Sequence, residues 1–597
     1  MTTFTAPLRD IRFVLDEVAN LGAVSALPGF EDSTGELVDS ILGEAGRIAE
    51  DVLAPLNRTG DRQGARWSEG RVTTPDGWGD AWKTLIDGGW NGLAFEPEWG
   101  GMGLPNTLNV AVGELWHAAN MAFGLCPLLT QGAVNALRQF GSDALKAVYL
   151  PPMVSGVWTG TMNLTEPQAG SDLAAIRTRA VPMEDGSHRL FGQKIFITYG
   201  DHDLTDNIIH LVLARLPDAP EGVKGISLFL VPKRLVNPDG SLGARNDVSC
   251  VSLEHKLGIH GSPTAVLAFG EQGGAQGWLV GEPNKGLAQM FVMMNHARQS
   301  VGLQGLAIAE RAYQQARAYA RDRVQGVPAG WQGTSRAAII HHPDVRRTLM
   351  GMKARIEAMR ALVYSTAAAH DRRHRHPDAK TRAEAAALEE LLTPVTKGWC
   401  TETGQDIASL GIQIHGGMGY IEETGAAQHL RDARITTIYE GTTAIQANDL
   451  VNRKLLRDGG AALSAYTAEV ARNADAMTAS DNLHLQTLGR GLADACRSLN
   501  DMARWILKQG QHPDLTAGAA GPFLDAFGLV AGGHGLGIGA RAALRRLQAG
   551  ETDDGFLSAK LATAAFYAHH ILCRVAAHRV TVIDGTQAIM DVDVDQL

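Results

Sequence analysis

Several common signatures are missing from this sequence of 597 residues. It contains no Walker A sequence, no G-x-S-x-G and no H-E-x-x-H, so the usual motifs of P-loop, serine-hydrolase and zinc-protease chemistry are absent. It also has no long run of Lys and Arg, and its formal net charge is −10, which argues against a nucleic-acid coat. Charged residues make up 20% and hydrophobic residues 45%, as in ordinary globular proteins.

Cysteine is scarce and scattered, and no C-x-x-C pair occurs. The five cysteines are Cys126, Cys250, Cys400, Cys496 and Cys573. An odd, dispersed set predicts buried thiols in a reducing compartment, so we expect a bacterial-style cytoplasmic enzyme. There is no unbroken run of about 18 apolar residues, and the N-terminal segment has no apolar core. We therefore expect neither a secretory signal nor stable membrane insertion.

The spacing of apolar residues and of turn-forming residues changes several times along the sequence. Its length suggests three to five domains. Leu37, Ile41, Ala45 and Ile48 have helical spacing, and a second helix reaching Tyr149 is expected to stop at Pro151-Pro152. The expected fold is mostly α with a central β-domain, in which short strands form a small antiparallel sheet or barrel. The expected domains are an N-terminal segment 1–35, a helical domain 36–158, a β-domain 159–283, a helical bundle 284–456 and an additional C-terminal helical domain 460–597.

Three further patterns have ordinary structural interpretations. His370, His374 and His376 have ligand-like spacing, but arginines surround them, which favours a solvated loop. The glycine-rich stretch 532–539 lacks a preceding strand and a βαβ unit, which favours close helix packing through small residues. The pair His341-His342 before Pro343 is typical of a helix start.

Four segments carry residue types suited to ligand binding or chemistry. The loop 162–172 combines hydroxyls with a glycine, and the strand 192–200 alternates so that Phe196 and Thr198 share a face. The segment 413–420 holds three glycines in four residues, which allows backbone N–H groups to approach a phosphate or a ring edge. The segment 438–443 holds a carboxylate beside a glycine. Taken singly, each also fits a polar loop, a barrel strand, an interhelical turn or a surface charge.

Together, in this order and spacing, these segments resemble the acyl-CoA dehydrogenase family. The signature residues are T-E-P-x-A-G-S-D, then G-x-K-x-aromatic-I-T, then Y-E-G-T, and the resemblance covers about residues 36 to 456. The N-terminal segment and the C-terminal block resemble the long bacterial subgroup that includes 3-methylmercaptopropionyl-CoA dehydrogenase. The resemblance implies a helical domain, a small β-barrel and a four-helix bundle, with FAD as cofactor.

The resemblance also implies roles for individual residues around FAD. Thr165 and Ser171 match positions near the flavin ring, and Thr198 matches a position that bonds near N5. Phe196 stands where the family usually has tryptophan over the flavin, which keeps a stacking face and loses an indole donor. Three more positions match FAD contacts that reach a neighbouring subunit, and a fourth matches a further contact with the cofactor. These residues are Arg323, Gln413, Gly417 and Thr442.

Glu440 matches the family's catalytic base, and Ser171 and Gly441 match positions beside the thioester substrate. The implied reaction is α,β-dehydrogenation of an acyl-CoA to a trans-2-enoyl-CoA, in which Glu440 removes the α-proton and hydride passes to flavin N5. The implied electron acceptor is an electron-transfer flavoprotein, and the additional domain implies a homodimer. Arg298 matches a family arginine of the bundle, for which a structural role is at least as suitable as a catalytic one.

Alternatives stay open at this point. An acyl-CoA oxidase would share the first half-reaction and use oxygen, while a non-catalytic acyl-CoA-binding helical protein would not need Glu440. The sequence does not locate the floor of the acyl pocket, so chain length, branching and a methylthio preference are undetermined.

Overall fold

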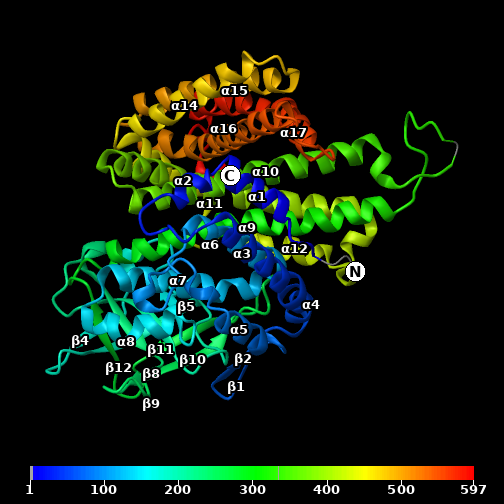
Figure 1. The fold of residues 1–597 in the computed structure, drawn as a ribbon. Coiled ribbons are helices and arrows are strands. Elements are labelled where there is room, and N and C mark those ends of the chain that lie inside the picture. The colour runs from blue at the N-terminus through cyan, green and yellow to red at the C-terminus, as the bar shows by residue number, and fades with distance from the viewer. Residues whose placement is uncertain (1–3, 334, 597) are drawn as a thin grey trace. The chain divides into compact units, whose positions relative to one another are not determined.

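The computed structural model describes residues 4–333 and 335–596, which fold into two compact units. One unit comprises residues 47–104 and 119–297 and contains the β-domain. The other comprises residues 1–46, 105–118 and 298–597 and contains the helical bundle and the C-terminal helices. Figure 1 gives the element labels used below.

In the first unit, four helices precede the β-domain, as the sequence predicts. They are α4 (Ala54–Gln63), α5 (Trp78–Asp87), α7 (Met121–Phe140) and α8 (Asp143–Val154), with a short hairpin of β1 (Arg66–Ser68) and β2 (Arg71–Thr73). The preceding helix α3 (Gly35–Ile48) buries Ile41, Ala45 and Ile48, which confirms three of the four positions predicted from helical spacing, whereas Leu37 is 36% exposed and Val38 is buried instead.

The prediction that Pro151-Pro152 stops a helix is wrong, because α8 continues through both prolines to Val154. Proline lacks an N–H donor but keeps its carbonyl. The carbonyls of Pro151 and Pro152 accept from the backbone N–H groups of Ser155 and Trp158, at 3.1 and 2.9 Å. The last helical turn is thus completed from downstream residues.

The β-domain is an eight-stranded sheet that closes on itself. Pairing runs from β5 through β12, β7, β6 and β4 back to β5, which forms a small barrel, while β11 and β10 extend from β5 and β3 pairs in parallel with β6. The strands are β3 (Thr159–Asn163), β4 (Arg179–Pro182), β5 (His188–Thr198), β6 (Ile208–Arg215), β7 (Ile226–Pro232), β10 (Val248–Leu253), β11 (Thr264–Phe269) and β12 (Ala275–Val280). A separate hairpin joins β8 (Arg234–Val236) and β9 (Leu242–Arg245). The barrel core includes Leu190, Val212 and Phe229.

The second unit is built on long helices. Its bundle and adjoining elements are α1 (Leu8–Glu17), α2 (Leu21–Ser25), α6 (Asn106–Ala119), α9 (Gly286–Asp322), α10 (Pro343–Arg375), α11 (Ala379–His415), α12 (Ala426–Ala433) and α13 (Thr443–Asp449). Helix α10 begins at Pro343, as predicted. The loop predicted around the histidines is wrong for His370 and His374, which lie inside α10, where His370 also pairs with Glu389 of α11 at 2.9 Å.

The C-terminal helices form a layer on α10 and α11 (Figure 1). They are α14 (Ala461–Thr478), α15 (Leu483–Lys508), α16 (Pro513–Gln548), α17 (Phe556–His570) and α18 (Val575–Ile583). A Cβ on Gly528 would lie 2.1 Å from the Trp399 ring, and one on Gly535 would lie 2.5 Å from Ala361. The glycines of α16 therefore permit close helix packing, which confirms the interpretation of stretch 532–539.

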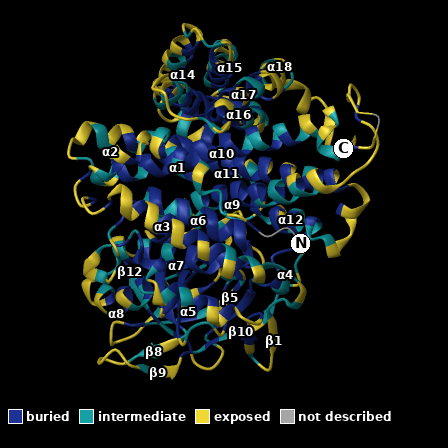
Figure 2. Cartoon of the chain, turned by 45° about the vertical axis from the view of Figure 1, so that its right-hand side comes forward, coloured by how far each residue is buried: buried dark blue, intermediate teal, exposed yellow. Residues whose placement is uncertain are grey.

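Helix α16 has the length and apolar composition that could cross a membrane, which the sequence analysis did not anticipate. In the protein, 67% of its most apolar window is buried, and Figure 2 shows the neighbouring helices α10 and α11 as largely buried too. A core helix of a soluble domain has the same composition, and the packing of α16 on α10 and α11 corresponds to that role.

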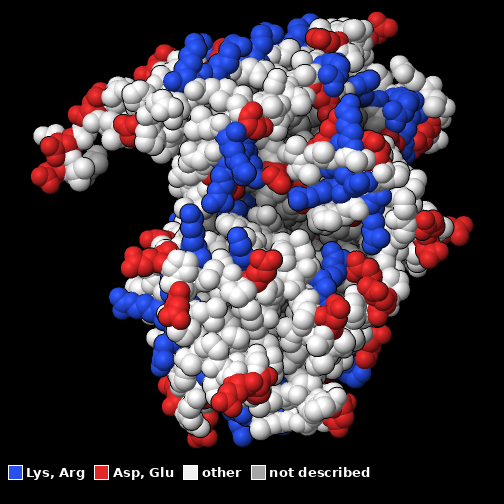
Figure 3. Space-filling view, turned by 90° about the vertical axis from the view of Figure 1, so that its left-hand side faces the viewer, with Lys and Arg blue, Asp and Glu red and all other residues white. Residues whose placement is uncertain are grey.

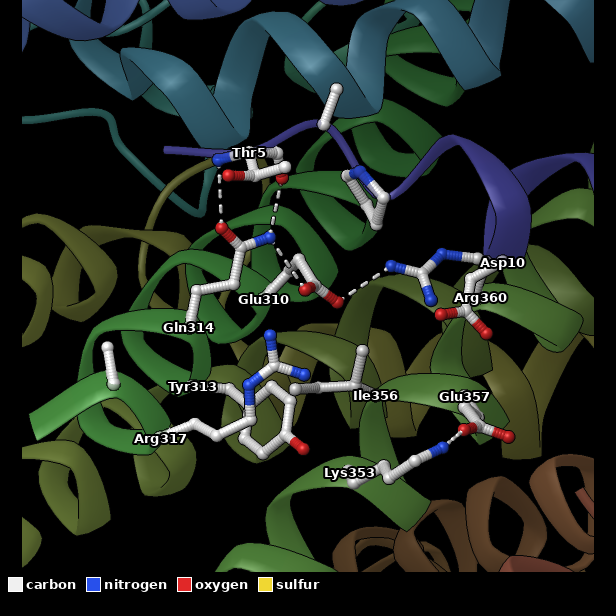
Figure 4. Close-up of a pocket in the computed structure, with 13 residues that line it drawn as sticks. Thr5, Asp10, Glu310, Tyr313, Gln314, Arg317, Lys353, Ile356, Glu357 and Arg360 are labelled. Atoms are coloured by element: carbon white, nitrogen blue, oxygen red, sulfur yellow. Dashed lines mark hydrogen bonds and ion pairs between the residues drawn. The ribbon is translucent and has the colours of Figure 1, made fainter. Parts of the chain in front are cut away.

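The N-terminal segment is fastened to the second unit by polar contacts. Thr5 exchanges two hydrogen bonds with the Gln314 amide, at 3.1 and 2.8 Å, and Asp10 of α1 pairs with Lys560 of α17. Beneath the segment lies a cavity of about 340 Å³ with both charge signs in its lining (Figure 4). The described residues that line it include none of those assigned to FAD or substrate by the resemblance.

Candidate active site

The loop that carries Thr165 and Ser171 follows β3 and is tied to strand β5. The Thr165 carbonyl accepts from the Ile195 backbone N–H at 2.9 Å, so Thr165 lies beside the start of the Phe196 segment. Ser171 is exposed, and the next residue, Asp172, caps a short 3-10 helix through the Ala174 backbone N–H at 3.0 Å. The loop therefore presents its hydroxyls on a backbone that is fixed at both ends.

An internal ion pair holds this loop in place. The Lys194 ammonium is fully buried and donates to Glu166 at 2.8 Å and to the Leu164 carbonyl at 2.9 Å. Glu166 also accepts from the Thr178 hydroxyl at 2.6 Å. Burial opposes ionisation of Glu166, but Lys194 and these hydrogen bonds outweigh it and hold its pKa at about 2. Both charges therefore persist at neutral pH.

Strand β5 is interrupted at the aromatic residue. Its pairing with β11 shifts by one residue between Lys194 and Ile197, and Phe196 has a φ of 60° with 58% of its surface exposed. The regular alternation predicted for residues 192–200 is wrong here, because a β-bulge inserts one extra residue. The bulge turns the Phe196 ring outward, two residues before Thr198, which pairs with Thr264. An exposed aromatic face at a strained position is suited to stacking a planar ring.

In the helical unit, three of the implied FAD contacts lie on neighbouring segments. Arg323 follows the end of α9, and Gln413 lies near the end of α11; both are exposed. The rings of Tyr319 and His415 are 4.5 Å apart, so these two helix ends are adjacent. Gly417 is exposed, and a Cβ there would meet no atom within 4 Å, which leaves its backbone open to a ligand.

The segment around Glu440 is a strained turn between helices. Glu440 has a φ of 57° and Gly441 a φ of 86°, and Gln446 of α13 donates its amide to both of their carbonyls, at 3.1 and 3.3 Å. Thr442 caps α13 by accepting from the Ile445 backbone N–H at 3.3 Å. A non-glycine residue in the left-handed region costs about 1–3 kcal/mol and persists only where its surroundings impose it.

Burial raises the pKa of the Glu440 carboxyl to about 7. Two cations of the unit, Arg298 and Lys397, act in the opposite direction and limit the rise. Arg298 is itself paired with Asp449 at 3.3 Å. A carboxylate that titrates near neutrality, in a strained turn, is suited to act as a general base.

Sequence reasoning missed four residues that organise these segments: Glu166, Lys194, Gln446 and Lys397. Glu166 and Lys194 lie inside two of the motifs already recognised. Their opposite charges in a predicted loop and a predicted strand could have indicated an ion pair between them. Gln446 and Lys397 carry no such signal, because a single polar residue in a helical pattern ordinarily faces solvent. Both are fully buried in the structure.

The sequence-predicted residues thus fall into two groups, one in each unit. The β-domain carries four of them, which are Thr165, Ser171, Phe196 and Thr198. The backbone of Thr165 is hydrogen-bonded to the strand that carries Phe196 and Thr198. The remaining residues belong to the helical unit. They are Arg323, Gln413, Gly417, Glu440, Gly441 and Thr442.

Four segments of the chain match models of known protein families. Models of the acyl-CoA dehydrogenase N-terminal, middle and C-terminal domains match residues 39–157, 161–271 and 284–455. A model described as acetyl-CoA dehydrogenase C-terminal like matches residues 462–593.

Individual relatives agree with these matches. The chain is 47% identical, over 98% of its length and 99% of the relative's, to a 3-methylmercaptopropionyl-CoA dehydrogenase of Ruegeria pomeroyi. It is 35% identical, over 99% of both chains, to a broad-specificity linear acyl-CoA dehydrogenase of Mycobacterium tuberculosis. A Bacillus anthracis acyl-CoA dehydrogenase, solved in complex with FAD, has the same fold, with a TM-score of 0.74 and 21% identity over 97% of this chain and 94% of that chain.

These matches account for the β-barrel, the bundle and the additional C-terminal helices, and they coincide with the order of motifs in the sequence. The chain belongs to the acyl-CoA dehydrogenase family, whose enzymes use FAD.

Proposed function

We propose that this enzyme oxidises an acyl-CoA thioester to a trans-2-enoyl-CoA, with Glu440 as the base that removes the α-proton. The observation that carries this proposal is the Glu440 carboxyl itself. Its pKa is raised to about 7 by burial, in a turn that Gln446 fixes through the carbonyls of Glu440 and Gly441. The carboxylate therefore has more basicity than an exposed glutamate and a set position.

The backbone at Glu440 supports the same step. Among the described residues, none accepts a hydrogen bond from the Glu440 backbone N–H. This donor can bind the thioester carbonyl oxygen and stabilise the negative charge that develops there as the α-proton leaves. In the step, the α C–H bond breaks, a new O–H bond forms on Glu440, and the electron pair is delocalised into the carbonyl.

The residues that the resemblance assigns to FAD have suitable chemistry for it. Phe196 offers an exposed ring face, Thr165 and Ser171 offer hydroxyls and backbone, and the exposed guanidinium of Arg323 suits a pyrophosphate. FAD, when bound, supplies the acceptor for the β-hydrogen as hydride. The protein's part is to bind the thioester and to present its α-proton to the Glu440 carboxylate.

An anaerobic flavin-reduction assay tests this proposal. Wild-type enzyme is mixed with a panel of acyl-CoA thioesters, and the flavin absorbance is followed. Glu440→Gln should keep FAD and lose at least about 100-fold in rate, because positioned general bases contribute about 10²–10⁴-fold. Glu423→Gln, which alters an exposed glutamate of the same unit, is the matched control. Full turnover by Glu440→Gln with bound FAD would refute the proposal.

For the substrate, we propose a 3-methylthiopropanoyl thioester. The support is the 47% identity over nearly the whole chain to the Ruegeria pomeroyi dehydrogenase. The same panel decides this point, since it includes linear acyl-CoAs of several lengths, which the Mycobacterium tuberculosis relative's name suggests. Faster flavin reduction by a linear acyl-CoA than by 3-methylthiopropanoyl-CoA would assign the enzyme to fatty-acid β-oxidation instead.

For the electron acceptor, we propose an electron-transfer flavoprotein, on the strength of the family. Lys and Arg are interspersed with Asp and Glu over the face in Figure 3, so charge alone does not single out a docking surface there. Reoxidation of the reduced enzyme in air tests the alternative. Rapid turnover with oxygen would indicate an oxidase.

A homodimer in the bacterial cytoplasm completes the proposal. Arg323, Gln413 and Gly417 lie on one exposed part of the helical unit, together with apolar side chains that include Tyr420, which is 86% exposed. A second copy of the chain would cover these side chains and place the three residues near its FAD. Light scattering coupled to size-exclusion chromatography measures the oligomeric state, and a monomer with full FAD content would contradict this arrangement.

A further inference from the structure

Lys397 is a buried lysine without a hydrogen-bond partner. It lies in α11, its relative exposure is 0%, and no acceptor for its ammonium exists among residues 4–333 and 335–596. The other lysine that is this deeply buried, Lys194, has both a carboxylate and a carbonyl as acceptors. Because burying an unpaired ammonium is costly, a methionine or leucine would ordinarily occupy such a position.

Close packing leaves Lys397 little freedom to reach solvent. Helix α9 contacts α11 on either side of it, where a Cβ on Gly302 would lie 2.7 Å from the Thr396 carbonyl and one on Gly305 would lie 2.3 Å from the Cys400 carbonyl. The backbones of α9 and α11 thus lie close together along the segment of α11 that carries Lys397, and the Lys397 side chain has no exposed surface. Its charge must be compensated by groups inside the unit.

Three charged groups act on Lys397. Glu440 attracts its ammonium most strongly, Glu402 attracts it less, and Arg298 repels it. Glu402 is exposed and accepts a hydrogen bond from Thr443 at 2.5 Å, just beyond the Glu440 turn. Arg298 has a carboxylate partner of its own in Asp449. Of the two cations that act on Glu440, Lys397 is thus the one whose principal counter-charge is Glu440.

We propose that Lys397 is a positioning residue for the base, whose enclosed ammonium keeps the Glu440 carboxylate ionised until that carboxylate takes the α-proton from the substrate. The proposal rests on the assignment of Glu440 as the base. It also explains why a buried cation without a hydrogen-bond partner is retained in α11, since an apolar side chain there would remove one of the two cations that limit the rise in the pKa of Glu440.

The charges of the site determine whether loss of Lys397 raises or lowers the pKa of Glu440. Burial raises the pKa of Glu440, and Lys397 and Arg298 counteract part of that rise. Burial likewise lowers the pKa of Lys397 to about 7, and Glu440 and Glu402 counteract part of that fall. Removing the Lys397 charge therefore raises the pKa of Glu440 further. The fraction of ionised Glu440 then falls at neutral and acidic pH and recovers at alkaline pH.

The test compares Lys397→Met, Lys397→Arg and wild type as FAD-loaded enzymes. The rate of anaerobic flavin reduction at saturating acyl-CoA is measured from acidic to alkaline pH. In Lys397→Met, the midpoint of the acidic side of the pH–rate profile should rise by about one pH unit. The rate below the midpoint should then be about tenfold lower than in wild type and should recover at high pH. Lys397→Arg keeps the charge and should keep the wild-type midpoint. Lys380→Met, an exposed lysine of the same helix, is the matched control.

A second measurement does not depend on turnover. Infrared spectroscopy follows the protonated carboxyl band that Glu440→Gln removes, in enzyme without substrate. That band should persist to higher pH in Lys397→Met than in wild type, by the same interval of about one unit. Lys397→Gln removes the same charge and replaces Lys397→Met if the latter does not fold.

Two results would overturn the proposal. One is a pH midpoint in Lys397→Met that matches wild type, whether the rate is unchanged or lowered equally at every pH, as a purely structural role predicts. The other is a shifted midpoint in Lys397→Arg with an unshifted one in Lys397→Met. Failure of the base assignment is recognised separately, because Glu440→Gln would then reduce its flavin at the wild-type rate.

Discussion

Replacing Glu166 by glutamine should destabilise the β-domain and loosen the loop that carries Thr165. The change leaves the Lys194 ammonium buried with only the Leu164 carbonyl as acceptor. Depression of the Glu166 pKa from 4.5 to about 2 corresponds to about 3 kcal/mol, at about 1.36 kcal/mol per pH unit. This agrees with the roughly 3–5 kcal/mol lost when one partner of a buried ion pair is removed.

The assay is urea unfolding at neutral pH, followed by circular dichroism, together with the FAD content of the purified protein. Glu166→Gln should unfold at lower urea and retain less FAD. Glu184→Gln, an exposed glutamate of the same unit, should match wild type. The double variant Glu166→Gln/Lys194→Met should recover part of the loss, because it removes the uncompensated charge.

The pH dependence has a defined direction. Since the folded pKa of Glu166 is depressed, its contribution is complete above about pH 4.5 and is lost as pH falls toward about 2. The acid-induced loss of stability in wild type should be correspondingly smaller in Glu166→Gln. Equal urea midpoints for Glu166→Gln and Glu184→Gln at neutral pH would refute the reasoning.

Four further substitutions have definite expected outcomes. Gly528→Ala places a Cβ 2.1 Å from the Trp399 ring and should lower the free energy of unfolding by about 1–3 kcal/mol, whereas Gly351→Ala, where no atom lies within 4 Å, should stabilise α10 by up to about 1 kcal/mol. Gln446→Leu removes both hydrogen bonds to the Glu440 turn and should slow flavin reduction about 5- to 30-fold at unchanged FAD content; an unchanged rate would count against a fixed turn. Arg323→Met should weaken FAD binding about tenfold or more in a fluorescence titration, and undiminished affinity would remove Arg323 from the cofactor site.

The long elements of this fold follow directly from sequence periodicity. Apolar residues at helical spacing predict α3, and the same spacing begins again after Gly286, where α9 starts. The apolar face of a long helix repeats every three to four residues, so the pattern is easily recognised. Pro151-Pro152 do not end α8 as predicted, because the backbone N–H groups of Ser155 and Trp158 still donate to the two proline carbonyls.

The candidate site was less evenly predictable. Glu440 and the FAD-associated residues were predicted from the resemblance of motifs to a family. Such a resemblance indicates what a residue does but not how deeply it is buried or which residues contact it. The bulge at Phe196 depends on the register between β5 and β11, and the burial of Lys397 depends on how α11 packs in the folded unit. Such features arise from tertiary packing, so a single sequence without its partners in space does not display them.

The contact between α1 and α17 constrains the order in which the protein can be completed. Asp10 and Lys560 are separated by 550 residues, and Arg9 and Asp554 pair at 2.7 Å beside them. At ribosomal rates of about 5–20 residues per second, α1 emerges about half a minute to two minutes before its partner helix exists. The contacts of Asp10 with Lys560 and of Phe13 with Phe556 can form only after that interval, so the N-terminal segment reaches its final packing late, after α10 has already been synthesised.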